Sequence, residues 1–210
     1  MIAALYIETR GVYSGLPDVD PWGVERDARL YAGPHPVVAH PPCKRWGRYW
    51  SGGPSAKVRR KKGDDGGCFK AALASVRRWG GVLEHPEASH AWAWFGLDRP
   101  PKSGGWIPAG DGVGWTCCVE QGQPVYGHPA RKATWLYAVR TDRPELVWGP
   151  AKGCVRLEQG GDVRTKEQAR ATRAAPGYKP AKRISTKAMR DTPLGFRDLL
   201  ISLARSVHRN

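Results

Sequence analysis

Apolar residues in the first part of the chain fall into short runs, each ending at a polar or proline-rich turn. The run from Ala3 to Ile7 ends at Glu8, and the run from Pro36 to Ala39 leads directly into His40-Pro41-Pro42-Cys43. Short continuous apolar runs bounded in this way are typical of buried strands. We therefore predict two buried strands, each followed by a loop that carries polar groups.

A helical pattern separates the second of these strands from a third. Between Gly67 and Trp79 the apolar residues recur at helical spacing, two arginines occupy the last turn, and two glycines follow. Val82-Leu83-Glu84 then reads as a strand that ends at Glu84, before His85-Pro86. Strand, helix and strand in alternation predict a parallel sheet, with both loops at the carboxyl ends of strands, where open α/β folds place their sites.

Later parts of the chain add two strands and a helix. Thr116 to Glu120 and Thr134 to Val139 are predicted strands, separated by turn-forming residues. Near the end, Thr192 is predicted to cap a helix that Pro193 opens, and one apolar stripe runs from Phe196 to Val207.

The length of 210 residues and the hydrophobic content of 40% support one well-buried core. We predict a single α/β domain over residues 1–210. Within it, residues 51–66 are predicted to form a flexible basic loop. Residues 150–190, which are rich in Gly, Pro, Ala and basic residues, are predicted to form an irregular basic segment.

The net charge of the chain favours a polyanionic binding partner. The 34 Lys and Arg exceed the 19 Asp and Glu, for a formal net charge of +15, and nucleic acid is the natural counterion. A merely basic surface or an anionic membrane is the alternative, but the basic residues are spread along the chain and not gathered in one amphipathic helix. Without a membrane-length apolar run or a signal-peptide pattern, we expect a soluble, cytoplasmic protein that binds DNA or another nucleic acid and no membrane. The oligomeric state is left open.

Two groups of residues are candidates for contacts with nucleic acid. Basic residues around the Pro-Pro-Cys loop and in the predicted flexible loop are expected to contact phosphates: Lys44, Arg45, Arg48, Lys57, Arg59, Arg60, Lys61, Lys62 and Lys132. A solvated run of charge is the alternative. Ten tryptophans are present, and those beside Arg or Gly are available for stacking on bases, although most tryptophans are core residues.

Cys43 is the candidate nucleophile. The chain has five cysteines with no CxxC pair, so neither a disulfide framework nor a zinc ribbon is indicated. Two preceding prolines hold Cys43 in a stiff, extended turn, and the cations that follow it favour the thiolate. The alternative is that this cysteine is a small buried apolar residue.

Glu84 is the candidate partner of Cys43. Burying a carboxylate at the end of a strand costs free energy unless the group is paired or has a functional role. The alternative to a functional role is an ion pair with an arginine. A thiol and a carboxyl on neighbouring strand ends are what chemistry at carbon 5 of a pyrimidine requires. The thiolate adds to carbon 6, and the carboxyl bonds to ring nitrogen 3.

These segments resemble the cytosine carbon-5 DNA methyltransferases. His40-Pro41-Pro42-Cys43 is similar to their Pro-Cys loop, and Val82 to Pro86 is similar to their Glu-Asn-Val strand end. Glu120 through Leu136 resembles the segment around their Gln-x-Arg-x-Arg motif, and Arg190 to Pro193 resembles their Gly-Asn-x-x-Pro motif. The resemblance covers about Val37 to Trp94, Thr116 to Val139 and Asp191 to Val207.

The resemblance implies a Rossmann-like methyltransferase core with a mainly parallel sheet, reduced in size. It implies a DNA (cytosine-5) base-modifying enzyme that acts on a flipped base, with Cys43 as nucleophile, Glu84 at nitrogen 3 and Arg131 orienting the base or phosphate. The methyl donor would be S-adenosylmethionine, and the residues that would hold it are Glu8, Pro41, Asp191 and Thr192.

The chain also departs from the family. Leu5-Tyr6-Ile7-Glu8 is not followed by a Phe-x-Gly-x-Gly loop, and His85 replaces the Asn that follows the glutamate. Two alternatives therefore stay open. One is a catalytically inactive relative, of the kind a phage genome retains, that binds DNA or a host protein. The other is a metal-dependent enzyme, although no ligand spacing supports a metal site and no metal is expected; its candidate ligands are His40, Cys43, His85, His90, Cys117, Cys118 and His128.

Overall fold

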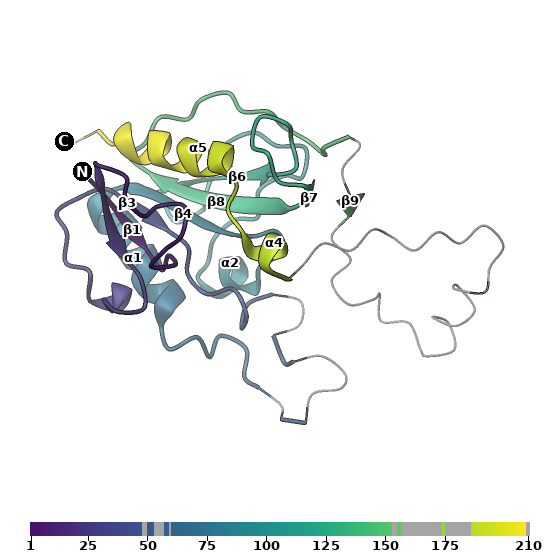
Figure 1. The fold of residues 1–210 in the computed structure, drawn as a ribbon, viewed down its shortest axis with the longest axis horizontal. Helices are drawn as coiled ribbons and strands as arrows, with labels where there is room; N and C mark the ends of the chain where they lie inside the picture. Colours follow the sequence, from purple (N-terminus) through teal and green to yellow (C-terminus); the bar gives the residue numbers. More distant parts are fainter. Residues whose placement is uncertain are drawn as a thin grey trace.

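The core of the protein is a mixed seven-stranded sheet with strand order β2-β1-β3-β4-β8-β6-β5 (Figure 1). The structure is a computed structural model that describes residues 1–47, 50–52, 57–58, 60–152, 155–156, 174 and 186–208. The strands of this sheet are β1 (Ile2–Leu5), β2 (Val19–Trp22), β3 (Val37–Ala39), β4 (Gly81–Pro86), β5 (Ile107–Pro108), β6 (Trp115–Glu120) and β8 (Ala133–Val139). A second pair joins β7 (Ala130–Arg131) to β9 (Val155–Arg156).

The sheet has a parallel half and an antiparallel half. Strands β2, β1, β3 and β4 run parallel, whereas β8 is antiparallel to β4, β6 to β8, and β5 to β6. The expected α/β fold is confirmed, but the expectation of a mainly parallel sheet holds only for these first four strands. The physical reason lies in the connections: a helix crosses over between β3 and β4, while β6 turns back directly toward β8.

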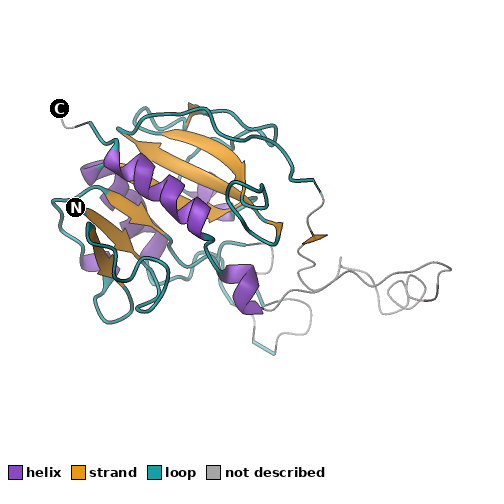
Figure 2. Ribbon diagram, turned by 45° about the horizontal axis from the view of Figure 1, so that its top comes forward, coloured by secondary structure: helices purple, strands orange, loops and turns teal. Residues whose placement is uncertain are grey.

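Two long helices cover opposite faces of the sheet (Figures 1 and 2). Alternate residues of the strands divide between two apolar clusters, as the two-residue period of a strand requires. Leu5, Ala39 and Leu83 share one cluster with α1 (Cys68–Trp79). The residues of the opposite parity, such as Ala4 and Val38, share the other cluster with α5 (Leu194–Arg205).

The predicted helix between β3 and β4 is confirmed as α1, and Asp65 anchors its start. The Asp65 carboxylate accepts hydrogen bonds from the backbone N–H groups of Gly67 (2.9 Å) and Phe69 (2.8 Å). It also accepts one from the indole Nε1 of the buried Trp46 (2.8 Å). One carboxylate therefore caps the helix and ties it to the loop that carries Cys43.

The final helix differs from its prediction at its first residues. Pro193 is the N-cap of α5, and no side chain makes a capping hydrogen bond there. The predicted cap by Thr192 is therefore wrong. Pro193 is extended (φ −67°, ψ 153°) and its carbonyl accepts from Arg197 N–H at 2.9 Å, so the helix begins one residue later than the pattern suggested.

Shorter elements complete the described part of the chain. They are the 3-10 helix η1 (Ala28–Leu30), α2 (His90–Trp94) and α4 (Thr186–Arg190). Within the described ranges no helix combines the length and the apolar character that crossing a membrane requires. Parts of the predicted flexible loop (53–56 and 59) and most of the predicted irregular segment (153–154, 157–173 and 175–185) lie outside the described residues.

A side chain at Gly81 would disrupt the strand pairing beneath the site. Its φ is +116°, and a Cβ there would lie 2.0 Å from the carbonyl oxygen of Val37, its partner in β3. Gly81→Ala is expected to lower the free energy of unfolding by at least about 2 kcal/mol, from backbone strain and overlap together, as measured by urea denaturation. Gly96→Ala is the control, because Gly96 also has positive φ (+69°) but open space around it. A similar loss at both positions would show that the overlap with Val37 contributes nothing.

Candidate functional site

Cys43 lies on a tight turn after the carboxyl end of β3. Its carbonyl accepts hydrogen bonds from the backbone N–H groups of Trp46 (2.9 Å) and Gly47 (3.0 Å). Pro41 is buried and Cys43 itself is exposed. The turn therefore holds a thiol at the surface, and the alternative of a sealed, apolar cysteine is excluded for Cys43.

Glu84 lies on the neighbouring strand and reaches the same region. Strand β4 continues to Pro86 through its pairing with β8. Glu84 therefore lies inside the strand, whereas the sequence suggested that the strand ends at Glu84. Its side chain is only 14% exposed. Because Ala39 of β3 pairs with Leu83 of β4, the loop with Cys43 begins beside Glu84, and the two side chains interact electrostatically.

A partly buried histidine is the direct partner of Glu84. His40 Nδ1 lies 3.0 Å from Glu84 Oε2, and His40 Nε2 lies 2.9 Å from the hydroxyl of Tyr13. With the proton on Nδ1, His40 donates to the carboxylate and Nε2 accepts from Tyr13. Glu84 is therefore held by a Tyr13–His40–Glu84 chain, and no arginine among the described residues pairs with it.

The charges around Glu84 keep it ionised. Burial on its own raises the pKa of this carboxyl, but the hydrogen bond from His40 and the charges of His40 and Lys132 outweigh burial and hold the pKa below its ordinary value. Glu84 is therefore a carboxylate at neutral pH.

Cys43 rests as a thiol. Protein atoms around the sulfur desolvate its anion, and the charge of Glu84 opposes ionisation, so the pKa of Cys43 is raised. The cations that oppose this shift are Lys132 and Arg190. The predicted activation by the cations that follow Cys43 in sequence stays a prediction. The cations that the structure places within electrostatic reach of Cys43, Lys132 and Arg190, lie far along the chain.

Lys132 joins the site to the C-terminal part of the chain. Its Nζ donates to the backbone carbonyls of Asp191 (3.0 Å) and Arg190 (3.4 Å). Burial lowers the pKa of this amine, while the negative groups of Glu84, Cys43 and Asp191 act in the opposite direction. The sequence placed Lys132 among the phosphate contacts, whereas the structure places its charge beside Cys43 and Glu84.

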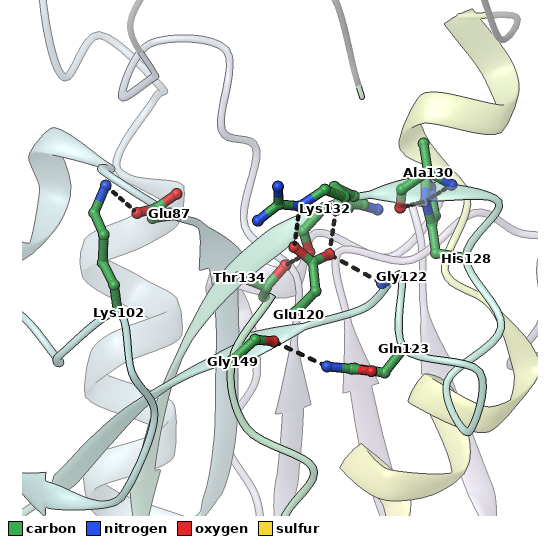
Figure 3. A network of polar contacts seen from close by, with 11 residues as sticks. Glu87, Lys102, Glu120, Gly122, Gln123, His128, Ala130, Lys132, Thr134 and Gly149 are labelled. Carbon is green, nitrogen blue, oxygen red and sulfur yellow. Dashed lines mark hydrogen bonds and ion pairs between the residues drawn. The ribbon is translucent and has the colours of Figure 1, made fainter. Parts of the chain in front are cut away.

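Arg131 points to a different carboxylate. Its Nε lies 3.7 Å from Glu120 Oε2. Glu120 also accepts hydrogen bonds from the backbone N–H groups of Gly122 and Lys132, which joins β6 to β7 (Figure 3). Arg131 therefore pairs with Glu120 and makes no described contact with Cys43 or Glu84, and its role on a base or phosphate stays a prediction.

The other predicted basic contacts that the structure describes are exposed or half-buried. Lys44, Lys57, Arg60 and Lys61 are exposed, and Arg48 and Arg59 lie outside the described residues. Arg45 and Lys62 are half-buried against Trp50: Arg45 donates to the Trp50 carbonyl at 3.4 Å, and Lys62 Nζ is 5.3 Å from the centroid of the indole.

The residues expected to hold S-adenosylmethionine do not fit a donor site. Residues 6–18, which follow β1, form turns and no helix, so no glycine loop leads into a helix N-terminus there. The buried Tyr13 fills the space toward His40, and Glu8 is exposed. Asp191 and Thr192 lie between α4 and α5, where the Asp191 carbonyl binds Lys132. We derive no step through this donor.

His85 supports the site and has no exposed surface from which to act on a substrate. It is buried, its Nδ1 lies 2.7 Å from Ser89 Oγ, and its ring packs against Phe69 and Trp92. The carbonyls of Pro41 and Pro42 face this ring, so His85 underpins the Pro-Pro-Cys loop. Among the residues that the structure describes, no three His, Cys, Asp or Glu side chains are grouped as metal ligands.

Burial of His85 makes stability depend on pH. Desolvation lowers the pKa of His85 from 6.5 to about 4, so the unfolded chain binds this proton more readily than the folded one. Stability is therefore full above pH 6.5 and is lost as pH falls from there through the folded value. The loss from this residue is expected to be about 3 kcal/mol, measured by urea denaturation at pH 7, 5.5 and 4. His85→Gln is expected to flatten this dependence, and an unchanged slope would contradict a neutral buried His85.

Sequence reasoning missed three residues of this site. The sequence indicates Arg190 only as part of a motif and His40 only as part of the Pro-Pro-Cys loop and as a candidate metal ligand. Tyr13 lies in a loop with no periodic pattern. Position directly after a buried strand was the one signal available for His40. Comparison of the chain with protein-family models, with curated proteins and with solved structures found no match in any of the three.

Proposed function

We propose that the protein modifies pyrimidine bases of nucleic acid, with cytosine carbon 5 in DNA as the reacting position and chemistry of the cytosine methyltransferase type. The observation that carries the proposal is that the turn after β3 holds an exposed cysteine, Cys43, beside the adjacent parallel strand β4, which carries a nearly buried carboxylate, Glu84. The charge of Glu84 contributes to raising the pKa of Cys43, so the two groups lie within electrostatic reach. Opposed thiol and carboxyl groups of this kind suit a flat ring attacked at one atom and hydrogen-bonded at another.

The proton balance of the addition closes within the site. Cys43 attacks carbon 6, the C5–C6 double bond opens, and the electron pair moves toward nitrogen 3, which takes a proton from Glu84. In the resting site Cys43 is a thiol and Glu84 is a carboxylate. The proton that Cys43 loses therefore accounts for the proton that Glu84 donates to nitrogen 3. Carbon 5 then takes a proton from water, and water accepts the original C5 hydrogen as a proton. Nitrogen 3 returns its proton to Glu84 as the C5–C6 double bond re-forms and the C6–S bond breaks, and the departing thiolate regains that proton.

The surrounding residues position the reacting groups. His40 binds Oε2 of Glu84, which assigns the base to Oε1, and Tyr13 holds the imidazole in turn. The positive charge of Lys132 lies beside both groups, so it stabilises the thiolate as it forms. These are positioning roles, since each acts through Cys43 or Glu84.

Charge and topology support the remaining parts of the proposal. The net charge of +15 and the exposed basic residues suit binding to phosphates, and a base must leave the stack to reach the thiol. The parallel strands β1, β3 and β4, with α1 as a crossover helix, support a reduced Rossmann-like core.

A second candidate is a catalytically inactive relative that binds DNA or a host protein. The observation that favours it is the loop after β1, where Tyr13 occupies the space toward His40 and no donor loop is formed. Phosphate binding by the basic surface would remain in such a protein, while chemistry at carbon 5 would be absent.

Exchange of the C5 hydrogen separates the two candidates without any donor. Reversible addition at carbon 6 makes carbon 5 exchange its hydrogen with water, so DNA labelled with tritium at cytosine C5 is expected to release tritium in the presence of the protein. Single-stranded and duplex DNA are both tested. Salt-sensitive binding to both DNAs with no release above the protein-free rate would contradict the enzyme and favour the inactive relative.

A further inference from the structure

An exposed tryptophan lies close to the Cys43 turn and has no part in the proposed chemistry. Trp94, the last residue of α2, is 62% exposed. The helix is tied to the turn, because His90 N–H donates to the Trp46 carbonyl at 2.8 Å while Trp46 N–H donates to the Cys43 carbonyl at 2.9 Å. The exposed indole is therefore carried on the same rigid unit as the thiol.

Buried aromatic rings hold this indole from beneath. The ring of Trp46, which is 2% exposed, packs edge-on against Trp94 with centroids 5.8 Å apart. Trp46 also contacts Phe69 and Phe95 at 5.7 Å each. A large apolar ring that is supported on one side and open on the other presents a flat surface to a ligand at little cost in conformational entropy.

Positive charge flanks this helix. Lys62 and Arg99 both act on His90 at the start of α2, where, with desolvation, they lower the pKa of the imidazole. Lys62 also lies over the ring of Trp50, and Arg99 is exposed. Both cations therefore lie within electrostatic reach of the helix that carries the exposed indole, and that helix is tied to the Cys43 turn. We name these three residues the Trp94 surface (Lys62, Trp94 and Arg99).

We propose that the Trp94 surface binds single-stranded nucleic acid beside the reacting base, with Trp94 stacked on an unpaired base and Lys62 and Arg99 on the adjacent phosphates. Charge complementarity selects a polyanion, and the open indole face selects one whose base faces are free, which a duplex does not offer. The proposal deepens the proposed function, because it rests on that function for the chemistry at Cys43 and names an unpaired strand as its substrate.

The test compares binding of one labelled oligonucleotide as a single strand and as a duplex. In fluorescence anisotropy, Trp94→Ala is expected to lower the affinity for the single strand about 5- to 50-fold, an effect typical of one lost base stack. The affinity for the duplex is expected to change less than about twofold, because the cations that contact phosphates remain. Trp94→Phe is expected to recover most of the loss. Trp115→Ala is the control, because Trp115 is a partly exposed tryptophan beside a cation, with Arg143 4.2 Å from its ring centroid, but it lies on β6.

The outcomes keep this proposal separate from the chemistry. Cys43→Ser is expected to bind the single strand as tightly as the unchanged protein, so a failure of C5 exchange with intact, Trp94-dependent binding would overturn only the proposed function. Unchanged single-strand affinity in Trp94→Ala, or equal losses for both DNAs, would overturn the stacking proposal. A change of sedimentation coefficient in Trp94→Ala without a change in DNA affinity would also overturn it and indicate a contact between copies of the chain.

Discussion

Replacing Cys43 by serine is expected to abolish exchange of the cytosine C5 hydrogen, with a rate at least about 10³-fold lower than that of the unchanged protein. A serine hydroxyl fits the same exposed turn, but it is a far weaker nucleophile toward carbon 6. The turn itself depends on the backbone carbonyl of residue 43, which the substitution keeps. Tritium release is the measurement, and an unchanged melting temperature shows that the fold is intact.

Cys68→Ser is the matched control for this experiment. Cys68 is half-buried at the first residue of α1, and desolvation raises the pKa of its thiol, as for Cys43. The same chemical change at Cys68 is expected to leave tritium release within about twofold, since surface substitutions away from a site have small effects. Equal losses in both variants, or residual exchange in Cys43→Ser at the original rate, would remove Cys43 from the reaction.

Local sequence patterns were sufficient to predict the elements that carry the thiol and the carboxylate. Apolar runs ending at proline marked β3 and β4, and helical spacing with terminal glycines marked α1. These signals are local, because strand and helix periods and the residues that stop them are properties of adjacent residues. The proximity of Cys43 and Glu84 then followed from parallel pairing alone.

The electrostatics of the site could not be predicted in the same way. Lys132 and Arg190 are two of 34 basic residues, and only the folding of the C-terminal segment toward β8 brings their charges to Cys43. Tyr13 belongs to an irregular loop, where nothing in the pattern indicates a contact with His40. The antiparallel direction of β8 relative to β4 and β6 was also missed, since the strand–helix–strand alternation that indicates parallel pairing covers only β3 and β4.

Glu84→Gln is expected to lower the C5 exchange rate about 10²-fold, the effect of losing a positioned acid, while affinity for DNA stays within about threefold. Glutamine has the shape of glutamate, and its amide oxygen can accept the hydrogen bond from His40 Nδ1, so the local structure is kept. The amide cannot supply the proton that nitrogen 3 needs. Glu87→Gln is the matched control, because Glu87 lies just beyond β4 and pairs with Lys102 at 3.0 Å (Figure 3), and its exchange rate is expected to be unchanged.

The pH profile distinguishes an acid from a merely structural carboxylate. The reactive pair, thiolate and carboxylic acid, holds the same number of protons as the resting pair, so its fraction is constant between the two pKa values. Because the pKa of Glu84 is lowered from 4.5 and that of Cys43 is raised from 9.0, the unchanged protein is expected to exchange at a constant rate across neutral pH. In Glu84→Gln only the thiolate is required, so its residual rate is expected to rise about tenfold per pH unit below the pKa of Cys43. A flat profile in this variant would show that Glu84 does not share its proton with the reaction, and the site would then contain a nucleophile without its acid.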